Sequence, residues 1–142
     1  MELAGLEFSG KDKKLEDSSK GLVLLVGQNL FFLGRIEAAA EPLGYEVRRA
    51  TTEAAFRKQL DVSSPDLILL DLEGDEPVWV GALDALKEIK PASTQVIAFG
   101  PHERVETLEQ ARTLGCDLVL NKGEFNRDLA KILERLDSSA GQ

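Results

Sequence analysis

An α/β fold, in which helices cover both faces of a parallel sheet, is predicted by three observations. Residues 66–71 contain four apolar residues in a row that end on Asp71, and so short a run is typical of a strand buried on both faces. Pro65 and Gly74 bracket this run with residues that break regular structure. Further apolar runs alternate along the chain with stretches of helical periodicity, which is the arrangement of consecutive βα units.

The five predicted strands are short runs that are mostly rich in apolar residues and end at breakers or polar residues. Residues 45–50 differ, because they are polar and alternate only weakly, as an outer strand would. In chain order the predicted strands are residues 22–26, 45–50, 66–71, 95–99 and 116–120.

Between and after the strands, apolar residues recur at helical spacing, which predicts five helices. The last helix shows this most clearly, because Leu129, Ile132, Leu133 and Leu136 fall on one face and Asn126 can cap its start. In chain order the predicted helices are residues 32–43, 53–60 (capped by Thr51 or Thr52), 82–89, 103–114 and 126–136.

This alternation predicts a flavodoxin-like (βα)5 three-layer sandwich, in which five parallel strands have the order 2-1-3-4-5. Residues 21–136 are predicted to form one domain. Residues 1–20 have mixed charge and few large hydrophobic residues, which is typical of a tail or linker, although Leu3, Leu6 and Phe8 leave a docking arm as the alternative. Residues 137–142 read as a polar C-terminal tail.

Composition excludes several classes of protein. The 142 residues carry a formal net charge of −8 with the basic residues scattered among acids, which argues against a nucleic-acid partner. No apolar run approaches the roughly 18 residues of a membrane span, and the first residues lack the features of a secretion signal, so a cytoplasmic protein without a membrane partner is expected. A single cysteine, Cys116, and a single histidine, His102, argue against a disulfide and a zinc site.

From residue 21 to residue 136 the chain resembles a response-regulator receiver domain of two-component signalling (CheY-like). Each matching motif is short, but together they have the order and spacing of that family. They are the strand end Leu69-Leu70-Asp71, the strand Val96-Ile97-Ala98-Phe99, the step Leu114-Gly115-Cys116-Asp117, and Lys122 just after the fifth strand.

The resemblance implies a phosphoacceptor aspartate, a lysine that holds phosphoryl oxygens, an acidic pair that binds Mg²⁺, and a hydroxyl residue that transmits the switch. Asp71 and Lys122 fall on the aspartate and the lysine. Gly27 and Gln28 fall where the acidic pair should be, and Gly100 falls on the hydroxyl position. The pattern therefore resembles a degenerate receiver, or pseudo-receiver, without a cofactor. We expect Lys122 to pair directly with Asp71 and to lower its pKa.

Two other interpretations stay open. In the first, Glu73, Asp75 or Glu76 turns a carboxylate toward Asp71, so that Mg²⁺ binds and the domain phosphorylates itself on Asp71 in a phosphorelay. In the second, the absent side chains of two glycines open a crevice for a small ligand; these are Gly27 and Gly100. Trp79 is assigned to the loop after Asp71, where it would shield the end of the sheet.

The preferred interpretation is a protein-interaction module and not an enzyme. The resemblance implies that its partner is a histidine kinase, an output domain or a second copy of the chain. It also implies a binding face formed by the fourth helix, the fifth strand and the fifth helix. The candidate partner residues on this face are Arg104, Arg112, Arg127 and Lys131.

Overall fold

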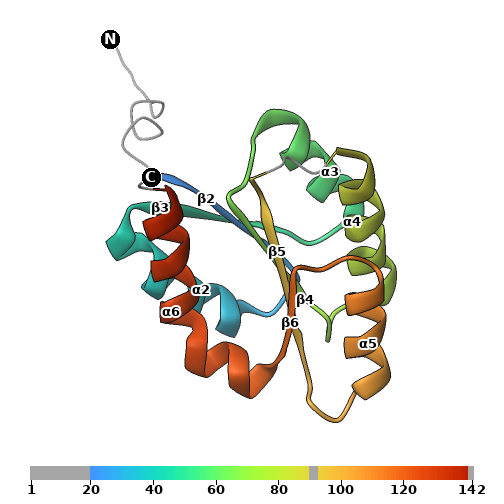
Figure 1. Cartoon of the computed structure of the whole chain (residues 1–142). Coiled ribbons are helices and arrows are strands. Elements are labelled where there is room, and N and C mark those ends of the chain that lie inside the picture. Colours follow the sequence, from blue (N-terminus) through green and yellow to red (C-terminus); the bar gives the residue numbers. More distant parts are fainter. Residues whose placement is uncertain (1–19, 90–92, 141–142) are drawn as a thin grey trace.

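The computed structural model describes residues 20–89 and 93–140, which form a five-stranded parallel sheet with helices on both faces (Figure 1). The strands are β2 (Gly21–Val26), β3 (Tyr45–Ala50), β4 (Leu67–Asp71), β5 (Gln95–Gly100) and β6 (Leu118–Asn121). Their order across the sheet is β3-β2-β4-β5-β6. In chain order this is 2-1-3-4-5, so the predicted fold class and strand order are confirmed.

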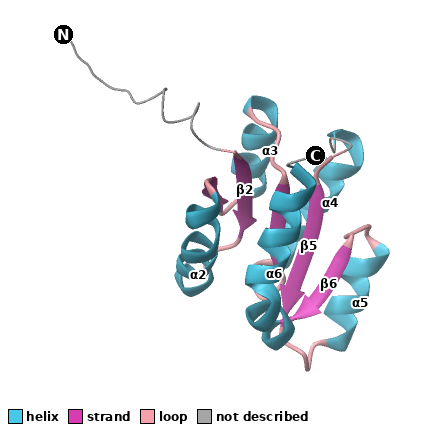
Figure 2. Ribbon diagram, turned by 60° about the vertical axis from the view of Figure 1, so that its left-hand side comes forward, coloured by secondary structure: helices cyan, strands magenta, loops and turns pink. Residues whose placement is uncertain are grey.

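Two helices cover one face of the sheet and three cover the other, as Figures 1 and 2 both show. The first face carries α2 (Leu30–Ala40), the 3-10 turn η1 (Glu41–Leu43) and α6 (Lys122–Ala140). The second face carries α3 (Glu53–Val62), α4 (Glu76–Ile89) and α5 (Val105–Thr113). None of these helices is long and apolar enough to cross a membrane, as far as the described residues go.

Strand β4 explains why the central run of the sequence is apolar at every position. Ile68 and Leu70 point into the cluster under α3, α4 and α5, while Leu67 and Leu69 point into the cluster under α2 and α6. All four side chains are fully buried. Each such burial contributes about 1.5–3 kcal/mol of hydrophobic stabilisation, so β4 is well anchored and holds Asp71 at a fixed position.

Helix α4 begins six residues earlier than the periodicity suggested, and this corrects the placement of Trp79. The prediction treated Pro77 as part of a loop, but proline is favourable in the first turn of a helix, where its missing N–H would have no partner. The backbone N–H groups of Val78 and Trp79 donate to the carbonyl oxygen of Asp75. Trp79 therefore lies in α4 and not in a loop, and it is buried in the core.

Helix α6 also begins earlier than expected, so Asn126 is not its cap. The side chain of Asn121 accepts a hydrogen bond from the N–H of Glu124, and the Glu124 carboxylate accepts one from the N–H of Asn121. This reciprocal pair is a capping box. The earlier start brings Phe125 inward, where it is fully buried. At the other end, residues 137–140, predicted as a tail, continue α6.

At the amino-terminal ends of the strands, two aspartates accept hydrogen bonds from backbone N–H groups of neighbouring strands. Asp66 Oδ2 accepts a hydrogen bond from Leu22 N at 2.9 Å, and Asp117 Oδ2 accepts one from Val96 N at 2.7 Å. These carboxylates satisfy strand N–H groups that would otherwise need water. Asp117 therefore has a structural role at the edge remote from Asp71.

Candidate functional site

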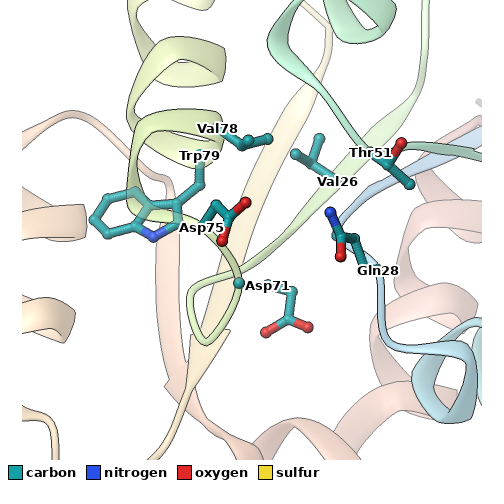
Figure 3. A pocket seen from close by; sticks show the side chains of 9 residues that line it. Val26, Gln28, Thr51, Asp71, Asp75, Val78 and Trp79 are labelled. Atoms are coloured by element: carbon teal, nitrogen blue, oxygen red, sulfur yellow. The ribbon is translucent and has the colours of Figure 1, made fainter.

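Asp71 is the last residue of β4 and lies at the carboxyl end of the sheet, as predicted. It is only 5% exposed. Its Oδ1 accepts a hydrogen bond of 3.0 Å from the backbone N–H of Glu73. The cavity beside it has a volume of about 10 Å³, which is room for about one water molecule. The residues that line this cavity are Val26, Gly27, Gln28, Thr51, Asp71, Gly74, Asp75, Val78 and Trp79 (Figure 3).

The ionisation of Asp71 differs from the prediction. Burial raises the pKa of its carboxyl above the usual value for aspartate, and the positive charge of Lys122 lowers it by less. The expectation that Lys122 would lower the pKa overall is therefore wrong. The cause is that desolvation of a carboxylate at this depth outweighs the attraction of a lysine that does not contact it directly.

Lys122 pairs with Glu73, not with Asp71, in the part of the chain that the structure describes. Its ammonium group also lies 5.5 Å from the centre of the Phe32 ring. Glu73 therefore links Asp71 to Lys122. Its backbone N–H donates a hydrogen bond to the Asp71 carboxylate, and its own carboxylate pairs with the Lys122 ammonium. The loop after β4 is in this way connected to the first residue of α6. The expected direct pair between Asp71 and Lys122 is corrected to an arrangement in which Glu73 lies between them.

Gly27 occupies a place where a side chain does not fit. A Cβ added to Gly27 would lie 2.8 Å from the Cβ of Asp71, which is closer than real Cβ atoms approach one another. The next residue, Gln28, is exposed, and its backbone oxygen accepts a hydrogen bond from Arg49. The two positions at which the resemblance places an acidic pair therefore differ. Asp71 fills the space that a side chain at position 27 would need, whereas the side chain at position 28 is exposed to solvent.

Gly100 is likewise surrounded closely, and by apolar atoms. A Cβ added there would lie 3.1 Å from Leu72 Cβ and 3.6 Å from Leu108 Cδ2. Leu72 is 1% exposed, so it fills the space beside the glycine. With Asp71 against Gly27 and Leu72 against Gly100, the two glycines do not open the crevice that a small-ligand site would need.

The described carboxylates of the acidic loop are not grouped around Asp71 as a set of metal ligands. Glu73 is engaged by Lys122, and Glu76 accepts a hydrogen bond of 3.3 Å from Gln110. Asp75 lines the same cavity as Asp71, but Figure 3 shows the two carboxylates pointing different ways. Within residues 20–89 and 93–140, no three histidine, cysteine, aspartate or glutamate side chains are grouped so that they could hold a metal ion. Mg²⁺ requires several oxygen ligands in near-octahedral geometry, so the donor set does not fit it.

The structure places the candidate partner residues on more than one surface. Arg104 precedes α5, and Arg112 on α5 pairs with Glu109. Lys131 lines a notch between β6 and α6. Arg127 lies instead in the groove between α2 and α6. Arg104, Arg112 and Lys131 therefore belong to the elements of the predicted face, whereas Arg127, although also on α6, lines the groove between α6 and α2.

Replacing Asp71 by asparagine should stabilise the protein at neutral pH. Asparagine keeps the oxygen that accepts from Glu73 but removes a charge whose burial raises the pKa of Asp71. We expect the free energy of unfolding at pH 7.5 to rise by about 1 kcal/mol, measured with urea. Burial disfavours the ionised form of Asp71 in the folded protein only. The stability gained by Asp71→Asn should therefore shrink as the pH falls through the pKa of folded Asp71, and it should vanish below about 3.9, the usual pKa of aspartate in an unfolded chain.

The matched control for this prediction is Asp61→Asn, since Asp61 is an exposed aspartate on α3. Its free energy of unfolding at pH 7.5 should change by no more than about 0.5 kcal/mol. A loss of stability in Asp71→Asn at pH 7.5 would show that the Asp71 charge is stabilised by its surroundings and would contradict the prediction.

No protein-family model matches the sequence, and no curated protein matches it. Solved structures do match. The receiver domain of a sensor histidine kinase from Pseudomonas aeruginosa PAO1, which has a magnesium ion coordinated in its active-site cleft, is 22% identical with a TM-score of 0.67 and covers 83% of this chain and 98% of that chain.

Two further receiver domains match over similar lengths. The signal receiver domain of a signal transduction histidine kinase from Syntrophus aciditrophicus is 21% identical with a TM-score of 0.69, covering 84% of this chain and 91% of that chain. The receiver domain of NtrX from Brucella abortus is 21% identical with a TM-score of 0.67, covering 82% of this chain and 98% of that chain. At these identities the likeness is one of architecture, and it agrees with the strand order and helix placement described above. The chain has the fold of a response-regulator receiver domain.

Proposed function

We propose that this chain is a cytoplasmic signal-transduction module of the receiver type, which binds a protein partner and does not take up a phosphoryl group through Mg²⁺. The observation that carries this proposal is the ion pair between Lys122 and Glu73. The lysine that the resemblance assigns to phosphoryl oxygens already holds a carboxylate of its own chain. The Mg²⁺ ligands and the hydroxyl that such chemistry needs are replaced by Gly27, Gln28 and Gly100. In this proposal the module has no enzymatic activity and no cofactor.

The alternative is a working receiver that is phosphorylated on Asp71 in a phosphorelay. It is supported by the position of Asp71 at the end of β4 and by the proximity of Lys122, whose charge acts on the Asp71 carboxyl. A nucleophilic carboxylate must be ionised and must reach the phosphorus atom. Asp71 is almost fully buried, which hinders the approach of a phosphorus atom, and burial raises its pKa, which disfavours the ionised form.

The partner we propose is a protein, with a histidine kinase, an output domain and a second copy of the chain as the candidates. The surface formed by α5, β6 and α6 supports this, because Leu118 on the edge strand is 43% exposed. Beside it lies a notch whose rim carries charges of both signs, lined by Leu118, Leu120, Asp128, Lys131, Ile132 and Arg135. An apolar centre with a charged rim is typical of protein interfaces. The net charge of −8 does not favour a nucleic-acid or anionic membrane surface.

Titration with Mg²⁺ and then beryllofluoride, followed by Trp79 fluorescence, tests the proposal. Trp79 lines the cavity beside Asp71, so its emission should report any ion or phosphoryl mimic that binds there. We expect no saturable change up to about 10 mM Mg²⁺, and no phosphoryl mass gain on incubation with acetyl phosphate. Asp71→Asn is the control and should behave like the wild type. Saturable quenching and a mass gain of one phosphoryl group, both lost in Asp71→Asn, would establish the alternative instead.

A further inference from the structure

A groove runs between α2 and α6. These two helices lie on the face of the sheet opposite to α3, α4 and α5 (Figure 1). Its volume is about 720 Å³. Leu30 and Phe31 stand at one end and are 65% and 61% exposed. The floor is made of small residues, among them Gly34 and Ala130, and a Cβ added to Gly34 would meet nothing within 4 Å. We call this feature the α2–α6 groove.

The lining of the α2–α6 groove is basic in composition, although the chain as a whole is acidic. Its described lining contains two arginines, Arg35 and Arg127, and no aspartate or glutamate. Arg35 lies 5.9 Å from the centre of the Phe31 ring and bonds to the backbone oxygen of Asn126. Arg127 pairs with Asp128 just outside the groove. An occupant that offers apolar side chains together with carboxylates would complement this surface.

The described chain begins between the two elements that form the groove. The backbone N–H of Lys20 donates to the carbonyl oxygen of Gly44, which follows η1 at the end of α2. The Lys20 ammonium pairs with Asp137 on α6 at 3.3 Å. Lys20 therefore lies on the same face of the sheet as the groove, at the end where α2 and η1 finish and α6 approaches its C-terminus.

Residues 1–8, which we call the leader segment, have the composition that the groove requires. Their large side chains include Leu3, Leu6 and Phe8, their charged residues are Glu2 and Glu7, and they contain no basic residue. The basic residues of this region follow later, from Lys11 on.

The leader segment is also tethered closely enough to reach the groove. About 12 residues connect Phe8 to Lys20, and an extended chain of that length spans up to about 40 Å. The part of α6 between Asp137 and Asn126 is about 17 Å long at 1.5 Å per residue. The tether therefore exceeds the path from Lys20 to the far end of the groove.

We propose that the leader segment binds in the α2–α6 groove, with its apolar side chains against Leu30 and Phe31 and its two carboxylates near Arg35 and Arg127. A second copy of the chain fits less well, because a two-fold symmetric contact through the groove would bring together two surfaces with the same basic lining. The bound segment covers the largest exposed apolar cluster on this face. This interaction is separate from the surface of α5, β6 and α6 used under the proposed function.

Cysteine cross-linking in the full chain tests this placement. Leu6→Cys is combined with Gly34→Cys in a Cys116→Ser background, since Gly34 has open space for the new side chain. The matched control combines Leu6→Cys with Val62→Cys, which lies on the other face of the sheet at the end of α3 and is 69% exposed. We expect the intramolecular disulfide to form at least about 10-fold faster with Gly34→Cys, because binding raises the effective concentration of the two thiols.

A charge variant separates specific binding from simple tethering. Adding Arg35→Glu should reduce the rate advantage of the Gly34→Cys pair by about 3-fold or more, because it opposes the carboxylates of the leader segment. Equal rates for the Gly34→Cys and Val62→Cys pairs would overturn the proposal. Disulfide-linked dimers as the main product with Gly34→Cys would also overturn it, and would assign the groove to a second copy of the chain.

Discussion

Phe125→Ala is expected to lower the free energy of unfolding by about 3–5 kcal/mol, the usual cost of removing a buried aromatic ring. The Phe125 ring is fully buried and stacks on Phe99 with 4.1 Å between ring centres and 5° between planes. Phe32 packs against both rings. The three rings join α2, β5 and α6 directly beneath the carboxyl end of the sheet, so the cavity left by alanine cannot be closed by one neighbour alone. Urea unfolding followed by circular dichroism measures the change.

Phe125→Leu tests the same packing with a variant that is expected to stay folded if Phe125→Ala does not fold. Leucine keeps part of the ring's volume and should cost clearly less than alanine, with the protein still folded. Val105→Ala serves as the surface control, since Val105 is 61% exposed, and its effect should stay within about 0.5 kcal/mol. A Phe125→Ala cost as small as that of Val105→Ala would show that the aromatic cluster does not stabilise this end of the domain.

Gly27→Asp should destabilise the protein by about 1–3 kcal/mol and should not create a magnesium site. A new Cβ would lie 2.8 Å from the Cβ of Asp71, so the backbone of the loop after β2 must shift or Asp71 must move. The new carboxylate would in addition stand beside the Asp71 carboxylate, and like charges at that distance disfavour ionisation of both. Unfolding in urea gives the stability, and the Trp79 titration with Mg²⁺ gives the binding.

Gln28→Asp is the matched control for Gly27→Asp, because it restores the other half of the acidic pair at an exposed position. Its effect on stability should stay within about 0.5 kcal/mol. If Gly27→Asp were as stable as Gln28→Asp, and if the double variant bound Mg²⁺ with a saturable fluorescence change, the packing argument would be wrong. The absent carboxylates would then be the only obstacle to metal binding.

The strands and the strand order could be predicted because burial on both faces leaves a direct mark on the sequence. The run Leu67–Leu70 admits no polar residue, since each side chain contacts one of the two helical layers. The starts of α4 and α6 were harder, because the residues that fix them also suit loops. Pro77 disfavours regular structure in general but is accepted in a first turn. Asn126 is a plausible cap, but the spacing of Asn121 and Glu124 forms the better one.

The candidate site could be predicted only as a set of residues, not as an arrangement. Asp71 was identified from its place at the end of a buried strand and Lys122 from the resemblance to a receiver domain, and the structure has Asp71 at the end of β4 and Lys122 directly after β6. The partner of Lys122 was missed because it depends on the turn after Asp71, where the N–H of Glu73 folds back to the Asp71 carboxylate. The sequence signal that could have shown it is the spacing of Asp71 and Glu73, in which an aspartate accepts from the backbone two residues on.

The ion pair between Glu73 and Lys122 is intramolecular. This affects any phosphate-bearing molecule that approaches Lys122 at the carboxyl end of the sheet. Such a molecule must displace a carboxylate that is present at an effective concentration of about millimolar or more, and that cannot be diluted. A small phosphodonor would have to compete with this carboxylate from free solution. A partner protein that presents many contacts at once would be far less affected, because it need not contact Lys122 at all.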